Sequence, residues 1–158
     1  MIVGCNSSIN FTEQRPAEPP VNIGIYDSRA IAVAFVGSDI FKQYMTNLTN
    51  RQEKAKVEGN HKLSDKLEQE GVALQKRLHQ QAFSTASVDN ILAHVKSQIL
   101  EIKKQTNVKD IVSKWDAQTV DVYHPMNQVD VTSLLIEAFK PNARQKKSAI
   151  EIQKHAPS

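Results

Sequence analysis

The sequence predicts an α+β fold in which a small sheet forms a body and a long helical hairpin projects from it. Three observations predict it. Residues 21–27 alternate apolar and polar side chains, which is the period-two pattern of a strand with one buried face. Residues 38–83 are amphipathic and rich in helix-forming residues, and strand character returns only at residues 110–124. The predicted order is therefore one strand, a long helical segment, and then further strands that return to the same sheet.

The opening strand passes directly into a helix. Asp27 or Ser28 is expected to cap this helix, because a short polar side chain can accept a hydrogen bond from a free backbone N–H of the first turn. Residues 30–36 are small and apolar, and Gly37-Ser38-Asp39 marks a break with a new helix cap. We therefore expect a short buried helix between the strand and the projecting hairpin.

The hairpin, or arm, covers residues 38–83 and has its turn at Gly59-Asn60, a strong turn signal. The limbs carry two apolar stripes at helical spacing, formed by Phe41, Tyr44, Met45, Leu48 and Ala55 in one and by Leu63, Leu67, Leu74 and Leu78 in the other. Two helices with one narrow seam each are expected to pack as an antiparallel pair. Each limb of about 20 residues would reach ~30 Å.

The rest of the body is expected in residues 88–140. Residues 88–102 carry a wide apolar stripe, and two strands are predicted at residues 111–115 and 119–124, joined as a β-hairpin by residues 116–118. Asp130 is expected to cap a last apolar helix. Residues 1–20 read as a disordered Pro-rich tether, residues 21–140 as one domain with its body at 21–36 and 88–140, and residues 142–158 as a basic, partly helical and frayed tail.

Composition narrows the classes of function. The 158 residues carry a net charge of +3 without a dense basic patch interleaved with aromatics, so nucleic acid is not an indicated partner. We find no nucleophile motif, no Gly-rich phosphate loop and no metal-ligand spacing among the five histidines, and therefore expect no cofactor and no metal. Asp27 and Arg29 form a conceivable catalytic couple. A helix cap with an ion pair, which could include Asp116, is the interpretation that we favour, and Trp115 is read as packing rather than as a ligand platform.

Cys5 is the single cysteine, so no internal disulfide can form. Ile2-Val3-Gly4-Cys5 resembles the end of a bacterial lipobox, and the polar residues that follow would suit a lipoprotein tether. No basic segment and apolar stretch precede it as in a signal peptide. Either the start is truncated or misassigned and Cys5 is a lipidation site at a membrane surface, or the match is chance and Cys5 is a cytosolic thiol in a disordered tail.

A cluster of basic residues flanks the predicted turn and is our candidate for binding partners: Arg51, Lys54, Lys56, Lys62 and Lys66. The cluster would attract acidic clients or anionic headgroups, and the alternative is a solvated helix face.

The order of elements, and the residues that form them, resemble the Skp (OmpH-like) family of periplasmic chaperones. The matching pieces are residues 22–27 as the opening strand, residues 110–117 and 120–123 as the closing hairpin, and Asp130-Val131-Thr132 as the start of an apolar helix. The resemblance covers about residues 21–36 and 88–140. It implies a homotrimer whose strands build a central barrel and whose arms surround a cavity for unfolded outer-membrane proteins. The arm here is short for that family, and residues 142–158 extend past its usual end.

We therefore expect a non-enzymatic protein of the periplasm or cell envelope that acts as an ATP-independent holdase for unfolded or outer-membrane proteins. The alternative is an envelope-anchored structural or adaptor protein that presents its arms to one folded partner. Three strands with two open edges make a poor isolated sheet, which favours self-association in either case.

Overall fold

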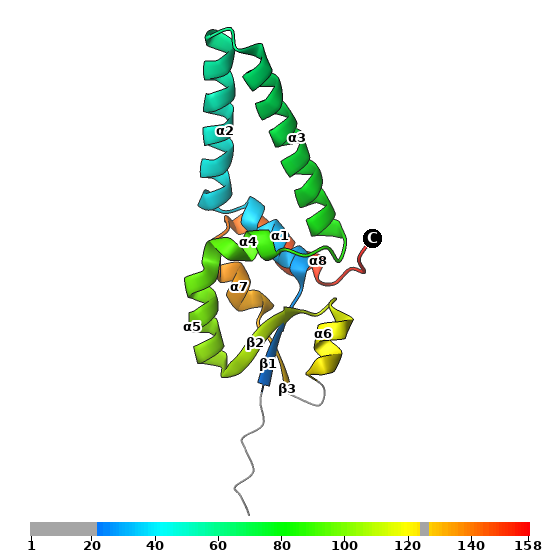
Figure 1. Cartoon of the computed structure of the whole chain (residues 1–158). Helices are drawn as coiled ribbons and strands as arrows, with labels where there is room; N and C mark the ends of the chain where they lie inside the picture. The colour runs from blue at the N-terminus through cyan, green and yellow to red at the C-terminus, as the bar shows by residue number, and fades with distance from the viewer. Residues whose placement is uncertain (1–21, 124–126) are drawn as a thin grey trace, which may run out of the picture.

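The computed structural model describes residues 22–123 and 127–158. It is a mixed helix and sheet structure, as the sequence predicts, with a three-stranded sheet at one end and the arm at the other (Figure 1). Helix α1 and the C-terminal helix α8 lie between the sheet and the arm. The arrangement places the feet of the arm on the body's helical layer rather than on the sheet itself.

The sheet has the order β2-β1-β3 and is entirely parallel. Its strands are β1 (Asn22–Tyr26), β2 (Val108–Ser113) and β3 (Asn127–Asp130). Gly24 lies in the central strand, where a Cβ would meet Ile111 Cγ1 at 3.0 Å, so a side chain at this position would press against the neighbouring strand. Because the strands are parallel, all three carboxyl ends meet at one edge of the sheet.

The predicted closing β-hairpin is replaced by a different structure. Residues 117–122 form a helix, α6 (Ala117–Val122), instead of the second hairpin strand, and β3 follows it and pairs with β1 rather than with β2. Asp116 starts α6 by accepting a hydrogen bond from Thr119 N at 3.1 Å. Val122, which lies within the second predicted strand, is 78% exposed. The predicted strand end at His124 lies outside the described residues.

Helix α1 (Ser28–Val36) is the centre of the core. Asp27 caps it, as predicted, by accepting a hydrogen bond from Arg29 N. Its small and apolar side chains pack against the short helix α4 (Asp89–Leu92), the 3-10 turn η1 (Ala93–Val95) and helix α7 (Thr132–Ala138). The single helix expected over residues 88–102 is thus broken, and its last part is α5 (Lys96–Thr106). Asn107, with φ 51°, ends α5 in the left-handed conformation that asparagine tolerates.

The arm consists of α2 (Asp39–Val57) and α3 (His61–Phe83), which run in opposite directions. Ser38 and Asn60 cap the two helices by accepting hydrogen bonds from Phe41 N and Leu63 N. Gly59 has φ 67°, a conformation that favours glycine, which confirms the predicted turn. The two helices meet at the turn and diverge toward the body (Figure 1).

The C-terminal tail is not frayed over its helical part. Helix α8 (Ala143–Ile152) packs along α1, with Ala149 fully buried. It also holds the foot of α2, because Asn142 N donates to Gly37 O at 3.0 Å and a Cβ on Gly37 would lie 2.3 Å from Gln145 Cβ. At the other foot, Ser158 N donates to Phe83 O at 2.8 Å. The tail therefore connects both feet of the arm to the body.

Candidate functional site

The carboxyl edge of the sheet gathers polar side chains, which makes it the first candidate site. Asp27 follows β1 directly, Lys114 follows β2 directly, and Thr132 lies two residues after β3. In open parallel sheets this edge is the usual place for ligands.

Asp27 is the centre of this group and is completely buried. Its Oδ2 accepts hydrogen bonds from Arg29 Nη2 and Lys114 Nζ, both at 2.8 Å. Its Oδ1 accepts from Arg29 Nε at 3.1 Å and from Trp115 Nε1 at 3.3 Å. Asp27 N donates to Thr132 Oγ1 at 3.1 Å, so contacts of one residue join the ends of all three strands.

The surroundings of Asp27 keep its carboxylate ionised. Burial alone would raise the pKa, but hydrogen bonds from Arg29, Lys114 and Trp115 outweigh it and lower the pKa of Asp27 from 3.8 to about 2. The ring of Trp115 lies against both cations that contact Asp27: Arg29 Cζ is 5.0 Å and Lys114 Nζ is 4.6 Å from its ring centroid. The remaining Arg29 nitrogen, Nη1, donates to His155 O at 2.8 Å.

This arrangement is that of a structural ion pair. Both carboxylate oxygens already accept hydrogen bonds, and Arg29 is only 1% exposed, so neither group has a face free for a substrate. Asp116 takes no part in it, because its side chain caps α6. The interpretation of Asp27 as a helix cap in an ion pair is therefore supported, and Asp116, named as a possible member of that pair, does not belong to it.

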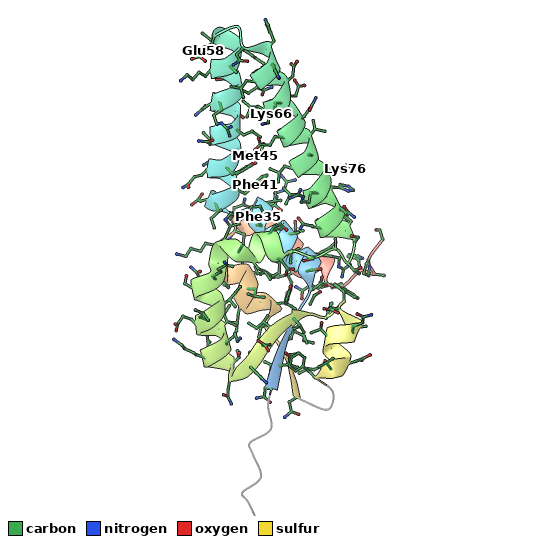
Figure 2. All side chains as sticks on the ribbon, viewed as in Figure 1. Phe35, Phe41, Met45, Glu58, Lys66 and Lys76 are labelled. Atoms are coloured by element: carbon green, nitrogen blue, oxygen red, sulfur yellow. The ribbon has the colours of Figure 1, made fainter. Side chains whose placement is uncertain are left out.

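The second candidate is an apolar groove at the foot of the arm, which we call the foot groove. It has a volume of about 780 Å³. Phe41, Met45 and Leu48 of α2 form one wall, and Figure 2 shows Phe41 and Met45 on the side of α2 that faces α3. Leu74, Leu78 and Phe83 belong to the α3 wall. The floor is made by Val33 and Val36 of α1 and by Gln145 and Ser148 of α8.

The groove ends where the limbs come into contact. A Cβ on Gly71 would lie 3.4 Å from Leu48 Cδ2, which is ordinary contact distance, and toward the turn Ala55 and Leu67 are only 1% and 2% exposed. Tyr44 Oη also donates to Glu70 Oε1 at 2.7 Å across the limbs. The outer part of the arm is thus packed around Ala55 and Leu67, and the groove extends from Leu67 toward the body, with the Tyr44–Glu70 hydrogen bond crossing between the limbs along its course.

The five basic residues predicted as a binding cluster lie around the turn. Arg51, Lys54 and Lys56 are in the last turns of α2, and Lys62 and Lys66 are in the first turns of α3. All five are exposed, and Lys54 forms a loose surface ion pair with Glu58 at 3.8 Å. They lie on the outer part of the arm, where Arg51 and Lys66 are chain neighbours of Gln52 and Leu67, two residues that line the foot groove.

Sequence reasoning recognised the residues of the foot groove but read them as a closed seam. Phe41, Met45 and Leu48 were expected to pack on the leucines of α3. The signal that distinguishes a groove from a seam is Gly71, which stands between Leu67 and Leu74 at the seam spacing and contributes no side chain. The Lys114 and Thr132 contacts to Asp27 could not be found without knowing that the sheet is parallel.

Metal ligands, membrane spans and the N-terminal cysteine are the remaining features that the sequence analysis considered. Among residues 22–123 and 127–158, no three His, Cys, Asp or Glu side chains are placed to hold a metal ion. Within the same ranges, no helix combines the length and apolar character of a membrane span. Cys5 and the tether at residues 1–20 lie outside the described residues.

The fold and both candidate sites define a small parallel α+β body that carries a helical arm. Comparison of the chain with family models, curated proteins and solved structures finds no match.

Proposed function

We propose that this protein is an ATP-independent, holdase-type chaperone of the periplasm or cell envelope, which binds unfolded or outer-membrane proteins through its helical arm. In this proposal it is not an enzyme and uses no cofactor. Its clients are held by weak contacts along the arm, and the body serves to position and multiply the arms.

The foot groove is the observation that carries the proposal. Its apolar lining keeps much of its surface in contact with water in the isolated chain, because Phe41, Met45 and Leu74 are only half-buried. Val36, Val72 and Phe83 are exposed, whereas the leucines at 48, 67 and 78 are buried. Apolar surface that stays in contact with water is costly, so it favours any partner that covers it. Methionine in such a wall adapts its shape to different partners, which suits a protein that binds many sequences.

Self-association belongs to the same proposal. Strands β2 and β3 are the edges of a three-stranded sheet, and the free backbone groups of such edges favour pairing with another chain. A homotrimer, as the family resemblance implies, would place three arms around one client. Three weak contacts on one particle bind more tightly than one, because the second and third contacts are intramolecular.

The test combines native mass with client protection. An outer-membrane β-barrel protein is diluted from urea into buffer without nucleotide, and its light scattering is followed with and without a molar excess of this protein. We expect suppressed aggregation and a native mass above that of the monomer. Aggregation that proceeds unchanged at every excess would remove the holdase function, and a folded monomer at micromolar concentration would remove the trimer.

A structural or adaptor protein is the second candidate, and the packed outer half of the arm favours it. Ala55 and Leu67 are buried between the limbs, so this half is a firm two-helix rod rather than an adaptable surface. Such a rod suits the presentation of one fixed surface, with an anchor at Cys5 as part of this proposal. An adaptor binds one folded partner with defined stoichiometry and leaves the aggregation of unfolded proteins unaffected.

A further inference from the structure

The segment that follows α8, residues 153–158, connects the edge of the sheet with the lower end of α3, and we call it the strap. Its backbone contacts both places. His155 O accepts a hydrogen bond from Arg29 Nη1 at 2.8 Å, and Ser158 N donates to Phe83 O at 2.8 Å. Figure 1 shows the strap beside the foot of α3. The strap therefore bridges the body and the second limb of the arm.

The strap is held more loosely than the helix that precedes it. In α8, Ala149 is completely buried, and Ile152 packs against the core. Most of the strap is exposed, namely Lys154, His155, Ala156 and Ser158. A segment with little buried apolar surface opens at a small cost in free energy while the rest of the protein stays folded. The boundary between the firm and the loose part of the C-terminal segment thus lies just after Ile152.

Both groups that the strap contacts belong to firmer parts of the fold. Arg29 is 1% exposed, and its Nε and Nη2 are bound to Asp27, so His155 O is the acceptor of the remaining Nη1. Phe83 is the last residue of α3, where backbone carbonyls have no partner within the helix. Opening of the strap would expose both groups to water without breaking the ion pair or unwinding α3.

On its other side, α3 is attached to the body through Gln81. This side chain is 3% exposed, and its Nε2 donates to Ser87 O and to Asn90 Oδ1, both at 2.7 Å. Leu78 is also buried, in the core cluster. Toward α2, in contrast, the foot groove of about 780 Å³ separates the limbs. Without the strap, α3 would keep the Gln81 attachment as a pivot and lose the contact at its last residue.

We propose that the strap is a releasable clamp on the arm. When closed, it fixes the lower end of α3 to the body. When open, it lets this end turn about Gln81, which changes the width of the foot groove. The inference goes beyond the proposed function, because the same motion would serve a chaperone and an adaptor alike.

Two shortened chains separate the two contacts of the strap. A chain that ends at Ala156 lacks Ser158 and loses only the Phe83 contact. A chain that ends at Gln153 loses the Arg29 contact as well. The matched control is the full-length variant Lys154→Ala, His155→Ala, which changes side chains and keeps the backbone atoms that make both contacts. Circular dichroism establishes that each variant is folded.

Two measurements follow the lower end of α3. Hydrogen exchange with mass spectrometry compares residues 78–83 with residues 61–70 of the same helix. Distances between spin labels are measured in a Cys5→Ser background, with labels at Ala73→Cys on α3 and Gln98→Cys on α5. The reference pair replaces Ala73→Cys by Gln43→Cys on α2. All three label positions are exposed.

We expect residues 78–83 to exchange at least about tenfold faster in both shortened chains, a difference of about 1.4 kcal/mol in local opening. Residues 61–70 should keep their exchange rates. The distance distribution between the labels on α3 and α5 should broaden, and that between α2 and α5 should not. Only the chain that ends at Gln153 should also unfold at a lower urea concentration, because Arg29 Nη1 then loses its buried acceptor.

Unchanged exchange at residues 78–83, with an unchanged distance between α3 and α5 in the chain that ends at Gln153, would overturn the inference. Equal broadening of both label pairs would also overturn it, since the strap would then support the whole body. The same changes in the full-length control would assign the effect to side chains and overturn it too. If the chain that ends at Gln153 does not fold, the chain that ends at Ala156 gives the same two measurements.

These outcomes are independent of the proposed function. Neither measurement involves a client, so a protein that fails to suppress aggregation can still show the release of α3. A rigid α3 in both shortened chains removes the strap and leaves the holdase proposal to its own test.

Discussion

Asp27 and Arg29, two positions apart in the chain, form a two-point ion pair inside the protein, with Nη2–Oδ2 at 2.8 Å and Nε–Oδ1 at 3.1 Å. Planar guanidinium and carboxylate groups match each other in this geometry. Lys114, Trp115 and Thr132 add contacts from the ends of the other two strands, and Arg29 reaches His155 in the C-terminal segment. Segments that are distant in sequence are thereby held at one edge of the sheet.

Asp27→Asn is expected to destabilise the protein strongly. The amide removes the negative charge and leaves Arg29 buried with its charge uncompensated, which typically costs about 3–5 kcal/mol. Urea unfolding followed by circular dichroism measures the loss. Asp116→Asn is the matched control, because Asp116 is exposed and asparagine also caps helices, so its cost should stay below about 0.5 kcal/mol. Equal effects of the two changes would contradict the structural importance of the ion pair.

Acid should weaken the protein through Asp27. The folded-state pKa of Asp27 is lowered to about 2 from 3.8, so the carboxylate stabilises the folded state above pH 3.8 and this stabilisation is lost as the pH falls through 2. A depression of this size corresponds to about 2 kcal/mol of unfolding free energy. Urea unfolding at a series of pH values between neutrality and pH 2 tests it. Asp27→Asn should show a shallower decline, and a decline as steep as that of the parent would assign the effect to other carboxylates.

Two glycines, Gly37 before the arm and Gly71 within it, should respond to alanine in opposite directions. Gly37→Ala places a Cβ 2.3 Å from Gln145 Cβ, so α8 must shift, at a cost of about 1–3 kcal/mol. Gly71→Ala meets only Leu48 Cδ2 at 3.4 Å and removes a glycine from a helix interior, which should stabilise by about 0.5–1 kcal/mol. Thermal unfolding of both variants decides the signs. A neutral Gly37→Ala would mean that α8 does not clamp the foot of α2.

Leu67 and Leu74 belong to one predicted seam but should differ in their importance. Leu67 is 2% exposed between the limbs, so Leu67→Ala should cost about 2–3 kcal/mol. Leu74 is half-buried and lines the foot groove, so Leu74→Ala should cost about 1 kcal/mol or less. Chemical unfolding gives both values. The reverse order would indicate that the groove is closed in solution.

How much the sequence could predict depends on the range of the interactions involved. The caps at Asp27 and Ser38 and the turn at Gly59-Asn60 were predictable, because each is decided by residues within one helical turn. The strand expected around Val122 was not correct, since alternation over so few residues is also compatible with a short helix, and the Asp116 cap favours the helix.

The parallel sheet and the foot groove depend on contacts between distant parts of the chain. The partners of β1 begin at residues 108 and 127, and the residues between them gave no sign of strand direction. The splay of α2 and α3 depends on α1 and on α8, which occupy the space between their feet and contact Gly37. A basic, polar tail gave no indication of that role. Only the missing side chain at Gly71 was a local sign of the groove.

The basic tip should act on the rate of association rather than on the strength of the complex. Arg51, Lys54, Lys56, Lys62 and Lys66 are exposed at the far end of the arm, so each contact with an acidic partner is expected to contribute about 1 kcal/mol or less. Reversal of Lys54, Lys56 and Lys62 to Glu should slow association with an acidic unfolded client and leave its dissociation almost unchanged. The difference from the parent should shrink between low and physiological salt, where the screening length falls to ~8 Å. Stopped-flow fluorescence at several salt concentrations measures both rates. If the tip reversal associates as fast as the parent at every salt concentration, the tip is a solvated surface, and the foot groove alone accounts for binding.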